Sequence, residues 1–236
     1  MRRMIYQSGA TENGMNGDEG IFSVEYCRGF RGCPRAALDG SALARLIEEK
    51  VTALGNEHSA GGDPEAALYH RKFRVSLSLC PNACSRPQIA DFGVIGAALP
   101  GATGNTCTGC NVCTGVCREG AISPRFGVPV IDYSRCVSCG ECARACPCGS
   151  IEIHSTGFRV LVGGRLGRHP RLARELGRLC TAEETAGLFE RSARLFLEHC
   201  LEGRRFAELL DRYDLAGEGL RVVDNGRFAV ASGGAK

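Results

Sequence analysis

The sequence lacks the features of a membrane protein, an exported protein or a nucleic-acid-binding protein. No apolar run approaches the roughly 20 residues that a membrane-spanning helix needs. Arg2-Arg3 is followed by polar and glycine-rich sequence instead of an apolar segment, so it is a poor export signal. A formal net charge of only +3 gives no electrostatic reason to expect nucleic-acid binding. We therefore expect a soluble protein with no membrane span and no nucleic-acid partner.

Cysteine, by contrast, is abundant, with 15 residues among 236. The middle of the chain carries two runs of the form C-x2-C-x2-C-x3-C, which begin at Cys107 and Cys136, and the second run is followed by Pro147. In such runs one tight loop supplies three thiolates, and the fourth cysteine binds the cluster of the other run. The spacing therefore predicts two [4Fe-4S] clusters, one on Cys107, Cys110, Cys113 and Cys146 and the other on Cys117, Cys136, Cys139 and Cys142.

A structural zinc site and disulfides are the alternatives for these cysteines, since C-x2-C pairs also bind zinc. Two four-cysteine runs at near-identical spacing disfavour both. Cluster ligands indicate a reducing compartment, so we expect a cytoplasmic protein. The repeat closely resembles the two-cluster bacterial ferredoxin, although Arg118 stands where proline commonly follows the first run.

Four further cysteines form the pairs Cys27-x5-Cys33 and Cys80-x3-Cys84. These spacings, with the stretches 74–96 and 158–173, resemble the sirohaem and [4Fe-4S] motif of the nitrite and sulfite reductase family. The resemblance covers roughly residues 21–215. It implies a third [4Fe-4S] cluster on Cys27, Cys33, Cys80 and Cys84, and a bridge from the Cys84 sulfur to the iron of a sirohaem.

The resemblance also implies the reduction of sulfite or nitrite, which takes six electrons. Cofactors carry such chemistry, while the protein contributes position, charge and access. The two ferredoxin-type clusters would receive electrons from a donor protein and pass them to the third cluster. Arg28, Arg31 and Arg86 stand between or beside cluster cysteines, so they are candidates for contacts with the substrate anion or with sirohaem carboxylates. The alternative for these arginines is solvated surface charge.

The first cysteine pair lies near the start of the sequence, since only 26 residues precede Cys27. Reductases of the family place a further ferredoxin-like half domain before this pair. We therefore expect a homo-oligomer or a second reductase subunit to complete the sirohaem pocket. Two other interpretations remain open: a sirohaem-free, three-cluster electron-transfer protein that serves a partner enzyme, and a protein whose clusters have a sensing or assembly role.

Hydrophobic periodicity predicts an α/β (α+β) fold, and the resemblance implies that this is a reductase-like sirohaem domain interrupted by an inserted two-cluster ferredoxin module. We expect strands at 21–26, 73–79, 92–98 and 158–162, and helices at 41–54, 169–178, 181–203 and 204–213. Residues 55–69 and 100–106 are expected connections. Ser41 is the expected cap of the first helix, and Thr181-Ala-Glu-Glu184 is a capping box. The predicted division is a flexible leader at 1–20, a reductase-like domain at 21–104 and 156–215, an inserted ferredoxin domain at 105–155, and a tail at 216–236.

A few other residues carry weaker signals. Cys148, Cys180 and Cys200 fit none of the three sets, so we expect them to be packing residues. His169 is a possible proton donor, but a position at the start of a helix is the simpler interpretation. The glycine-rich residues 163–167 match no dinucleotide fingerprint. They predict either a strand-to-helix turn or a close approach of the backbone to a macrocycle.

Overall fold

The computed structural model describes residues 18–59, 72–125, 127–199 and 205–210. Its centre is a six-stranded mixed sheet with the strand order β1-β2-β3-β4-β7-β8. β2, β3 and β4 run parallel to one another, and the other neighbouring strands are antiparallel. The strands of this sheet are β1 (Asp18–Glu19), β2 (Phe22–Tyr26), β3 (Phe73–Ser78), β4 (Phe92–Ala102), β7 (Ile151–Val162) and β8 (Arg174–Glu175). The expected mixed α/β class is confirmed.

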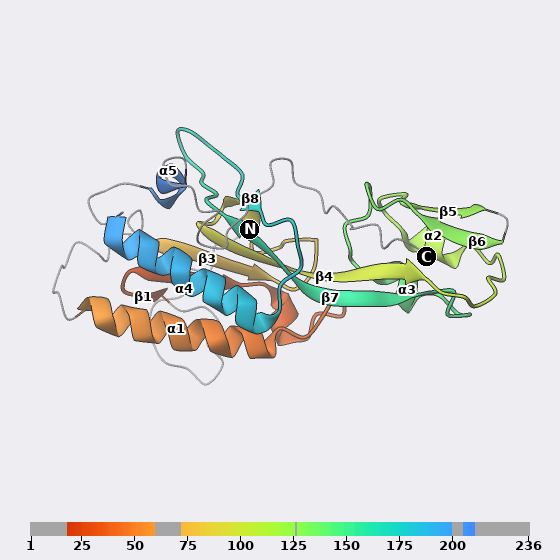
Figure 1. The fold of residues 1–236 in the computed structure, drawn as a ribbon, viewed down its shortest axis with the longest axis horizontal. Coiled ribbons are helices and arrows are strands. Elements are labelled where there is room, and N and C mark those ends of the chain that lie inside the picture. The colour runs from red at the N-terminus through yellow and green to blue at the C-terminus, as the bar shows by residue number, and fades with distance from the viewer. Residues whose placement is uncertain (1–17, 60–71, 126, 200–204, 211–236) are drawn as a thin grey trace, which may run out of the picture.

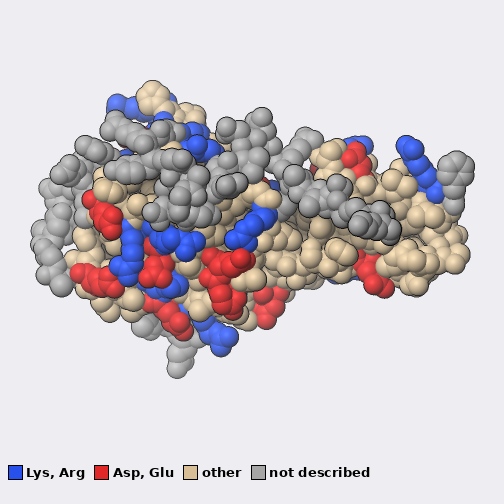
Figure 2. Space-filling model, viewed as in Figure 1, with Lys and Arg blue, Asp and Glu red and all other residues tan. Residues whose placement is uncertain are grey.

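Two long helices, α1 (Ser41–Ser59) and α4 (Ala182–His199), lie side by side over one face of this sheet (Figure 1). Ion pairs join them, Lys50 to Glu190 at 2.5 Å and Arg194 to Glu57 at 3.1 Å. Charges of both signs therefore cover this side of the molecule (Figure 2). Ion pairs at the surface of a helix layer contribute little, so the stability of this layer comes mainly from the apolar residues beneath it.

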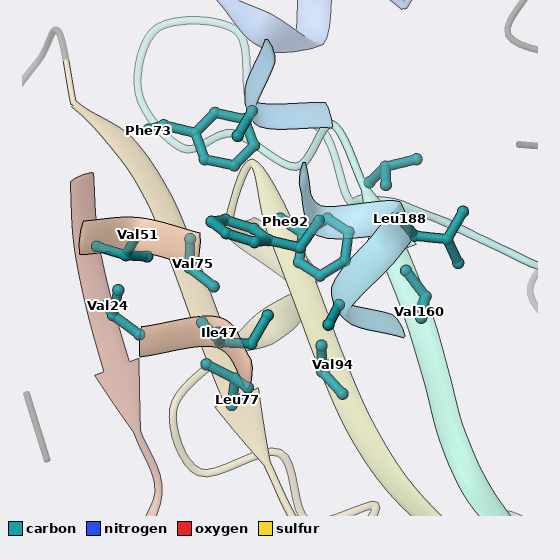
Figure 3. Packing of buried hydrophobic residues seen from close by; sticks show 14 of the residues in the cluster. Val24, Ile47, Val51, Phe73, Val75, Leu77, Phe92, Val94, Val160 and Leu188 are labelled. Carbon is teal, nitrogen blue, oxygen red and sulfur yellow. The ribbon is translucent and has the colours of Figure 1, made fainter. Parts of the chain in front are cut away.

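The hydrophobic core fills the space between the sheet and these helices (Figure 3). Alternate side chains of the four central strands point toward the helices, because successive residues of a strand face opposite sides. They meet side chains of α1 and α4, and the set includes Val24, Val75, Leu77, Phe92, Val94, Val160, Ile47, Val51 and Leu188. Phe73 lies at the centre of a group of rings and contacts Phe22, Phe189, Phe196 and Phe206 at centroid distances of 5.0 to 6.3 Å. The contact with Phe206 joins α5 (Phe206–Leu209) to the core.

Two glycines of β4 let the segment after β3 pack closely against the sheet. A Cβ at Gly93 would lie 2.3 Å from the Pro87 carbonyl oxygen, in the 3-10 helix η4 (Pro87–Ile89). A Cβ at Gly96 would lie 2.7 Å from the carbonyl oxygen of Leu79, the residue before Cys80. Both neighbours are backbone atoms. The Cys80–Cys84 loop can therefore lie this close to β4 only because glycine, which has no side chain, stands at positions 93 and 96.

β4 and β7 form a long hairpin that extends beyond the rest of the sheet (Figure 1). Its register runs from Phe92↔Val162 to Ala102↔Ile151. At its far end lies the segment 103–150, with α2 (Val112–Val116), β5 (Ile122–Arg125), β6 (Val128–Ile131) and α3 (Glu141–Arg144) around a small core of its own. The expected connection at 100–106 begins inside β4. Pro100 is accommodated there because the register shifts at Leu99/Pro100.

The stretch 169–178 is extended, so the helix predicted there is wrong. Arg165 pairs with Arg171 in an isolated bridge, and β8 pairs with the end of β7. The amide of Leu176 donates to the carbonyl of Val160 at 2.8 Å. The edge of β7 offers hydrogen-bond partners that a local helical pattern cannot reveal. His169 is consequently not at a helix start and lies exposed on a loop.

The helix ends were predicted with mixed success. The capping box is confirmed, because Thr181 N donates to Glu184 Oε2 at 2.9 Å and Glu184 N donates to Thr181 Oγ1 at 3.2 Å. The cap at Ser41 is wrong, since the Asp39 carboxylate accepts the Ser41 N–H at 2.9 Å. Helix α1 also continues to Ser59, past the predicted end at residue 54. Residues 1–17, 200–204 and 211–236 lie outside the described residues. They include Cys200, the whole predicted tail and most of the predicted leader.

Candidate metal centres

The first group of thiols lies where β2 and β3 end. These strands are parallel neighbours, so their carboxyl ends meet at one edge of the sheet. Cys27 follows β2 and its sulfur accepts hydrogen bonds from Gly29 N at 3.2 Å and Leu79 N at 3.3 Å. Burial raises the pKa of Cys80, and the nearby thiols of Cys27, Cys84 and Cys33 raise it further. Two cysteine pairs that are about fifty residues apart in the sequence thus meet at one place.

A buried serine network holds the residue after Cys84. Ser78 Oγ and Ser85 Oγ are 2.8 Å apart, Ser85 Oγ donates to the Leu77 carbonyl at 2.9 Å, and Ser76 Oγ donates to the Ser85 carbonyl at 2.5 Å. These bonds offset the strain of Ala83 (φ 50°) and Arg86 (φ 58°), two non-glycine residues in the left-handed region. Sequence reasoning missed this role of the serines. The alternation of Ser76 and Ser78 with apolar residues in β3 was the sequence signal that could have indicated this role.

The Cys84 thiol differs from the other thiols of its group in exposure. Cys27 is buried and Cys33 and Cys80 are half-buried, whereas Cys84 is exposed. The Asn82 side-chain amide donates to the Cys84 sulfur at 2.9 Å. A polar donor therefore orients a sulfur that remains open on its other side.

A cavity of about 420 Å³, lined by both polar and apolar residues, lies beside this loop, within the size range of ligand pockets. Of the three candidate arginines, Arg86 lines it, while Arg28 and Arg31 lie on η1 (Arg28–Arg31), outside its described lining. Arg86 makes only a loose pair with Glu25 at 3.7 Å. The polar residues around the cavity are Ser23, Glu25, Arg74, Ser76, Ser85 and Arg86.

Arg74 is a basic residue of this cavity that the sequence did not single out. Its guanidinium donates to the Ile89 carbonyl at 2.9 Å and lies 3.4 Å from the carboxylate of Asp91. Burial raises the pKa of Asp91, and the charge of Arg74 acts in the opposite direction. Arg74 is therefore fixed in place, whereas Arg86 is free to turn toward a ligand.

The second group of thiols lines a cavity in the segment beyond the β4–β7 hairpin. Its lining includes Cys107, Cys110, Cys113 and Cys146. Burial raises the pKa of Cys113, and the thiols of Cys146 and Cys107 raise it further. Gly109 N donates to the Cys107 sulfur at 3.4 Å. The structure thus brings together the four cysteines that the repeat assigns to one cluster.

The third group lies around Cys142 at the start of α3. Burial raises the pKa of Cys142 to about 12, with further contributions from Cys136, Cys139 and Cys117. Ser138 N donates to the Cys136 sulfur at 3.4 Å, and Ala121 N donates to the Cys117 sulfur at 3.3 Å. Cys117 and Cys146 therefore each lie with the run to which they do not belong, as expected for an interleaved pair of clusters. Ligation itself stays a prediction.

The donor sets fit polynuclear clusters better than single ions. Within the described part of the chain, no three His, Cys, Asp or Glu side chains converge closely enough to hold one metal ion. A tetrahedral zinc ion at about 2.3 Å from each sulfur would need that convergence. Groups of four thiols, with backbone N–H groups directed at their sulfurs, suit a [4Fe-4S] cluster.

The remaining cysteines differ from one another. Cys180 is 1% exposed, and its backbone pairs with Phe158, so it is a packing residue. Cys148 is half-buried and lines the cavity of the second group, so a simple packing role does not describe it. Hydrogen bonds, first from the Ser150 hydroxyl, lower the pKa of Cys148 to about 6. The glycine-rich residues 163–167 contact the chain itself, since a Cβ at Gly164 would lie 2.5 Å from the Gln88 carbonyl oxygen.

The described residues include no helix that combines the length and the apolar character of a membrane span.

Comparison with known proteins identifies relatives of this chain. A family model described as the nitrite and sulphite reductase 4Fe-4S domain matches residues 17–217. The chain is 34% identical over 156 residues to the coenzyme F420-dependent sulfite reductase of Methanocaldococcus jannaschii, covering 65% of this chain and 23% of that protein. It is 23% identical over 179 residues to the dissimilatory-type sulfite reductase beta subunit of Archaeoglobus fulgidus, covering 72% of this chain and 46% of that subunit.

The fold is also similar to a solved structure, that of dissimilatory sulfite reductase I. The TM-score is 0.58 at 19% identity, over 90% of this chain and 56% of that chain. This likeness shows a shared fold. The chain spans less than half the length of the two curated relatives. Because the family model matches most of the sequence, the protein belongs to the nitrite and sulfite reductase family, through its 4Fe-4S domain.

Proposed function

We propose that the chain is a subunit of a sirohaem-dependent sulfite reductase with three [4Fe-4S] clusters. Cys27, Cys33, Cys80 and Cys84 would hold the cluster next to the sirohaem. The other two groups would hold ferredoxin-type clusters that deliver electrons from a donor protein. Family membership and two relatives named as sulfite reductases support this proposal. Nitrite is the alternative substrate, since it is also a small anion whose reduction takes six electrons.

The exposure of Cys84 is the observation that carries the proposal. A thiolate that bridges a cluster to a macrocycle must face both, so it has to be the open one of its group. Cys84 is exposed, whereas its three companions are buried or half-buried. When bound, the sirohaem and its cluster supply the multi-electron reduction.

The residues around Cys84 can position the sulfur and a substrate anion. The Asn82 amide donates to the sulfur and so helps to orient it. Arg86, two residues beyond Cys84, lines the cavity, and Arg74 adds a second, fixed positive charge. A guanidinium donates several hydrogen bonds in one plane and suits an oxyanion or a carboxylate of the macrocycle. Arg28 and Arg31 remain weaker candidates, because they lie outside this described lining.

The structure also suggests an order for the clusters. Ala98 of β4 donates to the Ser138 carbonyl at 2.7 Å and forms a parallel bridge with Cys139. Two residues earlier along the same strand, Gly96 contacts the backbone of Leu79, next to Cys80. A strand advances about 3.3 Å per residue, so this stretch of β4 is short. We propose that the Cys136 group passes electrons to the Cys27 group, and that the Cys107 group accepts them first.

A second chain would complete the cavity beside the Cys80–Cys84 loop. The described lining carries two arginines, whereas a sirohaem has many carboxylates that need basic partners. We propose a second copy or another reductase subunit as that partner. Light scattering on the anaerobically purified protein tests this idea. A monodisperse monomer that retains sirohaem and reduces sulfite would contradict it.

Cofactor analysis of the anaerobically purified protein tests the main proposal. Iron and acid-labile sulfide should each be about twelve per chain, and acidic acetone should extract a sirohaem pigment. About twelve irons without pigment would support the alternative, a three-cluster electron-transfer protein. About eight irons would mean that the Cys27 group is empty, and the reductase proposal would fail.

Substrate kinetics test the role of the cavity. Arg86→Ala should raise KM for sulfite, or weaken sirohaem retention, because it removes a cation from the lining. Arg45→Ala is the matched control, since it removes the same charge from an exposed position of α1, outside the cavity lining. Equal effects of the two substitutions would show that the cavity is not the anion site.

A further inference from the structure

Five thiols, not four, surround the cavity of the Cys107 group. The Cys148 sulfur lies 3.8 Å from the Cys146 sulfur, and both residues line the cavity together with Cys107, Cys110 and Cys113. Cys148 therefore belongs to the ring of sulfurs around this cavity, although the four-cysteine pattern leaves it without a role.

The other half of the repeat shows what is special about Cys148. Cys117 and Cys146 each precede the same backbone turn, with Gly120 (φ 56°) and Gly149 (φ 63°) three residues later. Each turn ends in a buried isoleucine that begins a strand, Ile122 in β5 and Ile151 in β7. Two residues after Cys117 stands Glu119, whereas two residues after Cys146 stands the thiol of Cys148.

The two halves also differ four residues after the last cysteine. Ala121 has no polar side chain, and its amide donates to the Cys117 sulfur. At the equivalent place the Ser150 hydroxyl lies 3.3 Å from the Cys146 sulfur and 3.4 Å from the Cys148 sulfur. Ser150 is 2% exposed, so its hydroxyl is confined between the two sulfurs. Backbone conformation is shared between the halves, but the thiol pair and its linking hydroxyl belong to the second half alone.

We propose that Cys148 is a reserve ligand of the [4Fe-4S] cluster in this cavity: its sulfur lies beside the Cys146 sulfur in the resting protein and can replace it on the fourth iron. The inference rests on the proposed occupation of this cavity by a cluster. In the exchange, the iron–sulfur bond to Cys146 breaks and a bond from iron to Cys148 forms. Any proton that the Cys148 sulfur carries passes to Cys146, directly or through the Ser150 hydroxyl, so the charge of the cluster and its ligands is unchanged. No electron is transferred.

Single and double alanine variants of the full chain test this exchange, with Cys117→Ala as the matched control. Cys146→Ala should keep the iron and sulfide content of the wild type, because Cys148 takes the empty place. Cys146→Ala/Cys148→Ala should lose about one to four irons per chain and show the electron paramagnetic resonance signal of a three-iron cluster. Cys117→Ala should show the same loss at the other cluster. Glu119, and not a cysteine, stands there at the position equivalent to Cys148, so that cluster has no reserve thiol.

A loss in Cys146→Ala as large as that in Cys117→Ala would overturn the inference. Wild-type protein without a cluster in this cavity would overturn both the inference and the cluster proposal, so the two failures are distinguishable. Cys148→Ala gives a test in which all four primary ligands remain. Removal of the sulfur beside Cys146 should shift the reduction potential of this cluster, because the groups around the ligand sulfurs help to set that potential. An unchanged potential would contradict the resting contact.

Discussion

Substitution of Gly96 tests whether backbone packing positions the Cys80–Cys84 loop. A Cβ at this position of β4 would lie 2.7 Å from the oxygen, 2.9 Å from the carbonyl carbon and 3.0 Å from the Cα of Leu79. All three are backbone atoms, so no side-chain rotation can relieve the contact. In Gly96→Ala, either β4 or the residue before Cys80 has to move.

The expected size of the effect follows from two opposing terms. Overpacking a buried site costs about 1–3 kcal/mol. Loss of glycine flexibility in the unfolded chain returns about 0.4–1 kcal/mol. The net destabilisation should be about 1–2 kcal/mol, or roughly 2–8 °C in Tm for a chain of this size. The displaced cysteine loop should also lose its cluster, which lowers the iron content by about four per chain.

Anaerobic thermal unfolding and iron analysis measure both effects. Gly55→Ala is the matched control, because Gly55 lies within α1 and a Cβ there would meet nothing within 4 Å. That change should be neutral or stabilising by up to about 1 kcal/mol. Unchanged Tm and full iron content in Gly96→Ala would refute the idea that this close approach positions the loop.

Three further predictions concern single residues. Cys84→Ser should abolish sulfite reduction and leave the two ferredoxin-type clusters reducible by dithionite. Cys180→Ala, the control, should keep activity and cost about 1 kcal/mol of stability. Equal loss of activity in the two variants would contradict the role of Cys84 as the bridge to the sirohaem. Glu175→Ala should destabilise the fold by about 3 kcal/mol in denaturant unfolding. The guanidinium of Arg159 donates to both oxygens of this carboxylate at 2.6 Å in a largely buried place, and the substitution removes that partner. A change under about 0.5 kcal/mol would show that the pair is not needed. Burial raises the pKa of Cys142 to about 12, and its thiol has to lose a proton to bind iron. Iron retention against a chelator at this cluster should therefore rise with pH across the neutral range. Retention that does not change with pH would contradict this.

Features that depend on neighbouring residues were predictable from the sequence. The alternation of Phe73, Val75 and Leu77 with polar residues predicted β3, because successive side chains of a strand face opposite sides. The capping box before α4 was predictable because its two hydrogen bonds join residues three positions apart. The tight C-x2-C loops were predictable for the same reason, and backbone amides donate to sulfurs within them.

Features that depend on distant partners were not predictable in this way. The stretch 169–178 has a helical pattern, but the edge of β7 provides the carbonyl of Val160 as a hydrogen-bond partner for Leu176. The serine network across Ser76, Ser78 and Ser85 requires the chain to fold back over β3. Arg74 enters the candidate site for the same reason, since its partners lie on the returning segment.

The sequence by itself determined the chemistry that each cysteine loop can offer, because ligand type and spacing are local properties of the chain. Only the tertiary structure decided which loops meet and which sulfur stays open. The parallel pairing of β2 with β3 places Cys27 beside Cys80, and glycines at 93 and 96 allow the loop after β3 to lie close to β4. The same folding leaves Cys84 exposed and brings Cys148 to within 3.8 Å of Cys146. These positions follow from backbone contacts between segments far apart in the sequence, and no local pattern records such contacts.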